Sequence, residues 1–365
     1  MLISNTRSLI VGSIAICTVW LISVFIAEEI FRLLGDKPSG DLKGLFIEFG
    51  DRSYRLAPNV LTGANWASGE FEVATDDLGL RCDTAGRYSI GPQTVVDFLF
   101  MGDSQGFGNG VNFEDTIPGV AAELAAKQNL RTANTSVGGH GAMNQVEVVN
   151  ELQNKYGLNA KSYVVLLTPG MTMYGSGYNR ASVGSDGKLY GKETTRFEQG
   201  WIFLKQNAVS YSRLRTAIRN VGIGAEPSAE APFILQVYAK DFKEREARAN
   251  LTSFLEAVRR LGKGTQAPVS VAYVPLTVEV DFAGVEAAAQ ARGMTADRNL
   301  PLNLARDVSR ELGLPFINLR PVLEAEAAKE NALHLKGDYH YNSKLSKACG
   351  IELWRHLAQQ ANLAQ

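Results

Sequence analysis

From Thr94 onward, the sequence alternates between short apolar runs and longer segments with helical periodicity. Strands that alternate with helices predict right-handed crossovers, and therefore a parallel sheet covered by helices on both faces. The expected strands are Thr94–Met101, Arg131–Val137, Ser162–Thr168, Val269–Val274 and Pro315–Leu319. The expected helices are Thr116–Gln128, Ala142–Tyr156, Trp201–Asn220, Ala239–Leu261, Asn299–Leu312 and Ser343–Gln360. In an α/β fold of this kind, ligands bind beyond the carboxyl ends of the strands.

The composition is that of a globular protein. The 365 residues include 37 Lys and Arg against 38 Asp and Glu, so the basic excess typical of nucleic-acid-binding proteins is absent. This length accommodates one large domain or two smaller ones. The three cysteines, Cys17, Cys82 and Cys349, are too few for a disulfide scaffold and lack zinc-ligand spacing. A bond between Cys82 and Cys349 stays open at this stage.

An uncharged segment runs from Ser8 to Ala27 near the N-terminus. About 20 helical residues at about 1.5 Å per residue span about 30 Å, the hydrocarbon thickness of a bilayer. We therefore expect one membrane-spanning helix, with Arg7 on the cytoplasmic side and the main domain outside the cytoplasm. A signal peptide is the first alternative, but no small-x-small cleavage site precedes Glu28. A lipoprotein anchored at Cys17 is the second, but a large residue precedes that cysteine.

The organisation expected around this anchor has three parts. Residues 1–34 form a cytoplasmic tip and the transmembrane anchor. Residues 35–91 are rich in Gly, Asp, Asn and Pro, so we expect a leader of short strands and loops that packs on the main domain. Residues 92–365 form the α/β domain, with an insertion near residues 173–230.

A glycine-rich segment, residues 102–110 (GDSQGFGNG), follows the first expected strand directly. A serine at a strand-to-helix turn, with glycines that let the backbone bend, is where α/β hydrolases present a nucleophile. A phosphate-binding loop is one alternative, but the Gly-Lys-Ser/Thr ending of a P-loop and the glycine spacing of a dinucleotide site are missing. A turn without chemistry is the other. Ser104 is the candidate nucleophile, and Asp103 is expected to order the turn.

Three sequence blocks resemble those of the SGNH (GDSL-type) hydrolases. They are Gly102-Asp103-Ser104, residues 134–141 (NTSVGGHG) and residues 338–342 (DYHYN). The blocks occur in the order found in the family, and the resemblance covers residues 94–357. It implies a flavodoxin-like three-layer fold with a parallel five-stranded sheet and the activity of a serine esterase. The stretches Tyr54–Asn59 and Leu78–Arg81 also resemble the leader of membrane-anchored bacterial members.

The resemblance implies an oxyanion hole formed by the backbone N–H groups of Ser104 and Gly139 and one further donor. The family's third block reads Gly-x-Asn, whereas this chain has Gly170-Met171-Thr172, so the hydroxyl of Thr172 stands in for the amide. Asn179 or another group is the alternative donor. Removing one such donor costs about 100- to 1,000-fold in rate, so weak activity is the third possibility.

The last block has the spacing Asp-x-His in place of the commoner Asp-x-x-His. In this respect it resembles the polysaccharide O-acetyltransferase relatives in the same superfamily. Transfer of an acyl group to a sugar is therefore an alternative to hydrolysis.

Histidine can act as a general base near neutral pH, and the chain has four: His140, His334, His340 and His356. His340 follows Asp338 by two residues, and a carboxylate there can fix the tautomer of the imidazole. We therefore expect His340 as the base and Asp338 as its partner, with His334 as a rival base. His140 is expected near the pocket, where it is a substrate contact, part of a loop hydrogen bond, or a residue with no role. His356 is expected as a surface or packing residue.

The sequence thus predicts a two-step acyl transfer. Ser104, deprotonated by His340, attacks an ester carbonyl, and water or a sugar hydroxyl then resolves the acyl-enzyme. No metal or organic cofactor is expected. The expected partners are an acylated small molecule, glycan or lipid as substrate, and the membrane through the N-terminal helix, but no nucleic acid. A non-catalytic binding or assembly protein with the same fold is the alternative class, because Thr172 departs from the family pattern.

Overall fold

The computed structural model describes most of the chain outside one long internal stretch. The described residues are 2–33, 42–49, 53–66, 69–174, 181–184, 187–191, 232–239, 244–261, 268–329, 333–335 and 339–363. The helix expected at Trp201–Asn220 and most of the expected insertion at residues 173–230 lie outside them.

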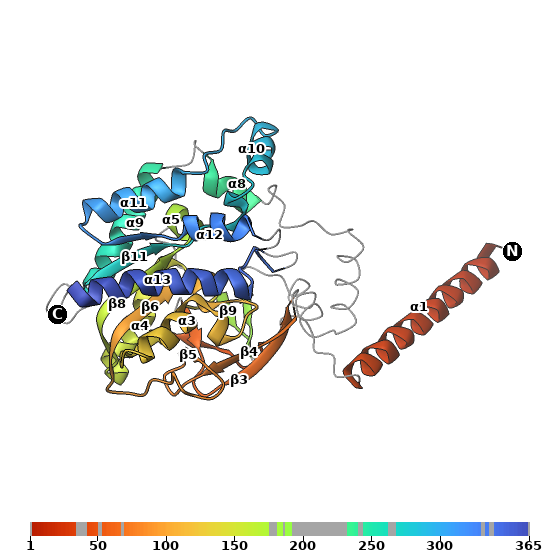
Figure 1. Ribbon diagram of the computed structural model, residues 1–365. Coiled ribbons are helices and arrows are strands. Elements are labelled where there is room, and N and C mark those ends of the chain that lie inside the picture. The colour runs from red at the N-terminus through yellow and green to blue at the C-terminus, as the bar shows by residue number, and fades with distance from the viewer. Residues whose placement is uncertain are drawn as a thin grey trace.

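A parallel five-stranded sheet forms the centre of the structure (Figure 1). Its strands are β6 (Val95–Gly102), β7 (Thr132–Asn134), β8 (Asn159–Leu167), β11 (Val269–Tyr273) and β12 (Phe316–Asn318). The order β12-β11-β8-β6-β7 is that of flavodoxin-like sheets, in which the direction of the chain across the sheet reverses between β6 and β8. The α/β class and the five strands are confirmed. β7 is shorter than expected, because Oδ1 of Asn134 accepts a hydrogen bond from the N–H of Ser136 (3.0 Å) and turns the chain.

Helices cover both faces of this sheet. One face carries α3 (Ile117–Ala126), α12 (Arg320–Ala327) and α13 (Ser343–Leu363). The other carries α4 (Ala142–Tyr156), α5 (Pro169–Tyr174), α8 (Pro232–Tyr238), α9 (Glu244–Arg259), α10 (Ala283–Gln290) and α11 (Leu300–Glu311). Phe98 and Phe100 of β6 point to the first layer, and Leu99 and Met101 to the second. This alternation explains why the four consecutive residues from Phe98 to Met101 are all apolar.

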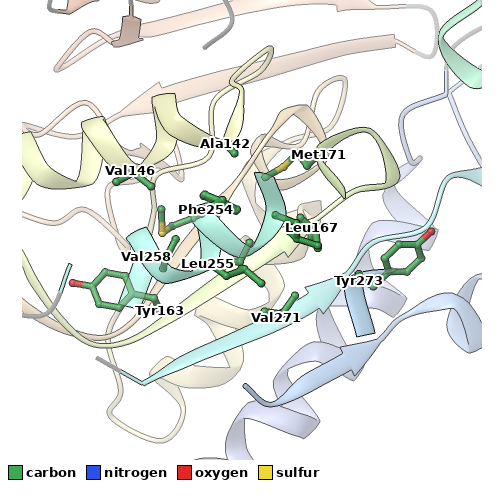
Figure 2. Close-up of a cluster of buried hydrophobic side chains, with 14 of the residues drawn as sticks. Ala142, Val146, Tyr163, Leu167, Met171, Phe254, Leu255, Val258, Val271 and Tyr273 are labelled. Carbon is green, nitrogen blue, oxygen red and sulfur yellow. The ribbon is translucent and has the colours of Figure 1, made fainter. Parts of the chain in front are cut away.

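Figure 2 shows the core under the second layer, where Leu255 and Val258 of α9 lie over Val271 of β11. The expected helices α3, α4, α9, α11 and α13 are confirmed, whereas α8, α10 and α12 were not predicted as separate helices.

The described part of the leader contains short antiparallel strands. They are β1 (Phe46–Phe49), β2 (Ser53–Leu56), β3 (Leu61–Trp66), β4 (Gly69–Thr75) and β5 (Arg81–Cys82). A hairpin of β9 (Ala181–Val183) and β10 (Leu189–Gly191) packs on it, and the N–H of Phe46 donates to the carbonyl of Gly187 (3.0 Å). Tyr54 and Phe71 share an apolar cluster with Phe107 and Val137, which follow β6 and β7. The leader is thus packed against the loops at the carboxyl edge of the sheet.

The N-terminal helix α1 (Leu2–Leu33) contains the segment for which a membrane span was expected. Large apolar side chains on it are exposed, including Trp20 (67%) and Phe25 (65%). Among the residues that the structure describes, no helix is both long enough and apolar enough to cross a lipid bilayer. The transmembrane helix predicted at Ser8–Ala27 is therefore not found in the structure.

A buried ion pair that the sequence did not indicate joins the ends of β11 and β12. Arg320, just after β12, bonds Glu279 in the short helix η2 (Thr277–Glu279), with Nε to Oε2 at 2.6 Å. The hydroxyls of Tyr238 and Tyr273 each donate to Oε1 of Glu279 at 2.8 Å. Burial raises the pKa of Glu279, and the charge of Arg320 opposes this rise. The carboxylate depends on Arg320 for its charge partner.

Replacing Arg320 by Met is expected to lower the free energy of unfolding by about 3 to 5 kcal/mol, because it leaves a buried carboxylate without a countercharge. Urea unfolding followed by circular dichroism measures this loss. The control is Arg355→Ala, which breaks an exposed pair with Glu352 (2.6 Å) and is expected to cost at most about 1 kcal/mol. Equal losses in the two variants would contradict the assignment.

Candidate active site

The turn that carries Ser104 lies between β6 and β8, where the order in which the chain adds strands to the sheet reverses. Ser104 begins the short helix α2 (Ser104–Phe107), and Asp103 caps it by accepting the N–H of Gln105 at Oδ1 (3.0 Å). The other carboxylate oxygen of Asp103 accepts from the hydroxyl of Thr168, directly after β8 (2.6 Å). Burial raises the pKa of Asp103, while the hydrogen bonds from Thr168 and from the N–H of Gln105 oppose the rise. Asp103 orders the turn, as predicted.

Two glycines after Ser104 allow this turn to form. A Cβ on Gly106 would lie 2.6 Å from the Oγ of Ser136, so α2 can approach the loop after β7 only without a side chain there. Gly108 ends α2 with a positive φ of 83°, a conformation that favours glycine. The glycine spacing therefore serves packing and helix termination, and it places Ser104 at the carboxyl edge of the sheet.

The leader holds the far end of α2 through Arg81. The guanidinium donates hydrogen bonds to the carbonyl oxygens of Phe107, Gly108 (2.8 Å) and Val111 (2.5 Å). It also stacks over the ring of Phe107, 4.6 Å from its centroid. Burial lowers the pKa of Arg81 to about 9. Because carbonyls at a helix C-terminus lack partners within the helix, a buried cation here stabilises the end of the helix that carries the candidate nucleophile.

The leader also contacts the loop of residues 138–140, which holds the expected oxyanion-hole residue Gly139. The hydroxyl of Tyr54 donates to the carbonyl of Gly138 (3.1 Å). Nε2 of His140 lies 2.8 Å from the carbonyl oxygen of Tyr54, so Nε2 carries the proton. His140 is 4% exposed, and burial lowers its pKa from 6.5 to about 4. The structure thus shows the loop hydrogen bond expected of His140, and its contact with a substrate stays a prediction.

The segment around His340 meets the Ser104 turn through the side chain of Gln105. Nε2 of Gln105 donates to the carbonyl of Tyr339 (3.2 Å), and Oε1 accepts from the N–H of Tyr341 (3.3 Å). His340 is 4% exposed and its ring stacks on that of Tyr339, with centroids 4.5 Å apart. The residue next to the candidate nucleophile therefore contacts both neighbours of the candidate base.

Several hydrogen bonds fix this segment before α13 begins. The carbonyl of His340 accepts from the N–H of Leu335 (2.8 Å), and the hydroxyl of Tyr341 donates to the carbonyl of Pro275. Oδ1 of Asn342 accepts from the N–H of Leu345 (3.0 Å) and caps α13. His340 thus sits in a short connection that is anchored on both sides.

The remaining candidates are placed less completely. Asp338 and Asn179 lie outside the described residues, so their roles stay predictions. Thr172 lies in α5, which begins two residues after β8, but its side chain is not among those described. His334 pairs with Tyr341 in an isolated antiparallel bridge, which keeps it near the His340 segment. His356 lies on α13 with Nε2 3.2 Å from a carboxylate oxygen of Glu352, in agreement with a surface role.

The cysteines and other possible ligands indicate no further centre in the described part of the chain. Cys82 and Cys349 are buried free thiols, so the bond considered between them is not formed. No group of three or more His, Cys, Asp or Glu side chains within the described residues could hold a metal ion.

Three residues of the candidate site were not predicted from the sequence. Tyr54 and Arg81 contact the loops of the site from the leader, and Gln105 contacts the segment of His340. Tyr54 and Arg81 belong to stretches that had been singled out only for their resemblance to a leader. Gln105 lies between the candidate nucleophile and a glycine. A polar amide at this position in the turn was the only sequence signal that pointed to it.

Lowering the pH is expected to destabilise the fold through His140. The unfolded chain binds this proton near pH 6.5, whereas the folded chain binds it only near pH 4, so stability is complete above pH 6.5 and falls toward pH 4. A shift from 6.5 to about 4 corresponds to a loss of about 3 kcal/mol, at about 1.4 kcal/mol per pKa unit.

The measurement is urea unfolding at several pH values for the wild type and for His140→Gln, which has no titrating imidazole. The difference between the two free-energy curves should shrink as the pH falls from 6.5 to 4. Parallel curves over this range would show that His140 is not held neutral by the fold.

The sequence matches no protein-family model and no curated protein sequence. Among solved structures, the chain is similar to the psychrotrophic esterase EstA from Pseudoalteromonas sp., with 11% identity and a TM-score of 0.39 over 73% of this chain and 98% of that one. It is also similar to the acetyl xylan esterase AlAXEase (11% identity, TM-score 0.40, 72% and 99% covered). A third similar structure is the lipase/acylhydrolase from Enterococcus faecalis (9% identity, TM-score 0.37, 72% and 96% covered).

Proposed function

We propose that the chain is a serine esterase that cleaves acyl esters, with Ser104 as nucleophile, His340 as general base and Asp338 as the partner of the base. The observation that carries this proposal is the pair of hydrogen bonds from Gln105 to the residues on either side of His340. They join the turn of Ser104 to the segment that carries His340. Nucleophilic acyl transfer requires a base within reach of the nucleophile, and this connection supports the proposed pairing of the two residues.

In the proposed mechanism, His340 takes the proton of Ser104 as its Oγ attacks the ester carbonyl. The backbone N–H groups of Ser104 and Gly139, with the hydroxyl of Thr172, stabilise the tetrahedral oxyanion. The intermediate collapses as His340 gives its proton to the leaving alcohol, and an acyl-enzyme remains. Water then attacks the acyl carbonyl while His340 takes its proton. The second tetrahedral intermediate collapses as His340 returns that proton to the Oγ of Ser104, which releases the acid and restores the serine.

The substrates that we propose are acyl esters, acetyl esters in particular, on carbohydrates or cell-envelope components. The proposal rests on the sequence blocks shared with SGNH hydrolases. The Asp-x-His spacing at residues 338–340 favours one second candidate, transfer of the acyl group to a sugar hydroxyl. The two activities differ only in the acceptor that resolves the acyl-enzyme, so an added acceptor sugar distinguishes them by the acylated sugar that forms.

The Ser104→Ala variant is expected to lose at least about 1,000-fold in hydrolysis of p-nitrophenyl acetate, because the nucleophilic oxygen is gone. It is also expected not to react with a fluorophosphonate probe, which labels only activated serines. The matched control is Ser270→Ala on β11, whose hydroxyl donates to Gln360 (2.8 Å) and takes no part in the proposed chemistry.

Equal rates for wild type and Ser104→Ala would exclude Ser104 as the nucleophile. A wild-type chain that neither hydrolyses the ester nor reacts with the probe would favour the non-catalytic alternative, a binding or assembly protein.

We also propose that α1 attaches the protein to a membrane, with the main domain outside the cytoplasm. The proposal rests on the uncharged sequence from Ser8 to Ala27 and on the exposed apolar side chains from Ile16 onward. After a carbonate wash of isolated membranes, the full chain is expected in the pellet and a chain that starts at Leu42 in the supernatant. Recovery of both chains in the supernatant would exclude attachment through α1.

A further inference from the structure

We infer that Gln105 is a positioning residue that sets the place of His340 relative to Ser104. The inference rests on the proposed function, because it concerns the base of that reaction. Gln105 itself need not touch the substrate. Its contribution is to hold the imidazole where it can take the serine proton.

The contacts of Gln105 are suited to this role. Its amide bonds the carbonyl of Tyr339 (3.2 Å) and the N–H of Tyr341 (3.3 Å), which are the backbone groups on either side of His340. Two bonds to both sides of one residue restrain rotation as well as translation of that residue's backbone. Because Gln105 directly follows Ser104, these bonds restrain the backbone of His340 relative to Ser104.

Glutamine is the chemically appropriate side chain for these two contacts. One planar amide supplies a donor to the carbonyl and an acceptor to the N–H. Glutamate would keep only acceptors when ionised, and Met or Leu would offer no comparable pair. Gln105 is 5% exposed, so water competes poorly for the two bonds.

Gln105 is itself held in place by the sheet. Its N–H donates to Oδ1 of Asp103 (3.0 Å), and Oδ2 of Asp103 accepts from Thr168 (2.6 Å). Hydrogen bonds therefore run from the end of β8, across the turn after β6, to the segment that carries His340. The segment of the proposed base is therefore attached to the same two strands, β6 and β8, that position the proposed nucleophile.

The test compares Gln105→Met with Gln153→Met in the full chain. Gln153 is also 5% exposed, but it lies on α4 and bonds the hydroxyl of Tyr163 (2.6 Å). Gln105→Met is expected to lower kcat for p-nitrophenyl acetate by about 10- to 100-fold with KM unchanged, since a displacement near 1 Å can cost this much. Fluorophosphonate labelling should slow by a similar factor. Gln153→Met should retain wild-type kcat.

A double variant separates positioning from a general loss of structure. If Gln105 acts through His340, then Gln105→Met should change the residual rate of His340→Ala by less than about twofold. A full multiplicative loss in the double variant would overturn the inference, as would a wild-type kcat in Gln105→Met. In both cases an active wild type leaves the proposed function standing.

If the wild type proves inactive and the proposed function fails, amide hydrogen exchange still tests whether Gln105 holds the His340 segment. The amide of Tyr341 should then exchange faster in Gln105→Met than in wild type or Gln153→Met, because its acceptor is lost. Unchanged protection of this amide would show that Gln105 does not hold the segment.

Discussion

The hydrogen bond between Asp103 and Thr168 joins the loops that follow the neighbouring strands β6 and β8. Between these strands, the order in which the chain adds strands to the sheet reverses. In folds of this kind, parallel strands on either side of that point send their connecting helices to opposite faces. The bond ties these two loops to each other. Asp103 also caps the turn that carries Ser104. Gln105 in that turn is hydrogen-bonded to the segment that carries His340.

The leader belongs to the site as much as the sheet does. Arg81 holds the end of α2, and Tyr54 contacts the loop of Gly138 and His140, so the two small antiparallel sheets of the leader hold two loops of the candidate site. Burying a cation among carbonyls removes it from water, and its lowered pKa reflects this cost. The fold bears that cost at the helix that presents the candidate nucleophile.

Much of the main domain could be predicted from the sequence because its strands are buried on both faces and its helices on one. β6 and α4 lie where the apolar pattern placed them. β7 is shorter than its apolar run, because a side-chain bond at Asn134 ends it. α12 and α10 escaped prediction because they are short segments whose helical form depends on packing against neighbours. Local pattern carries little information about such contacts.

The sequence by itself determined the fold class, the candidate nucleophile Ser104 and the candidate base His340, because apolar periodicity and short motifs are local properties of the chain. Only the tertiary structure decided that Gln105 spans both sides of His340 and that Arg81 holds α2 from the leader. These contacts join residues that are far apart in sequence, such as Gln105 and Tyr339, 234 positions apart. A hydrogen bond over such a separation depends on how whole layers pack, and a single sequence carries no local pattern for it.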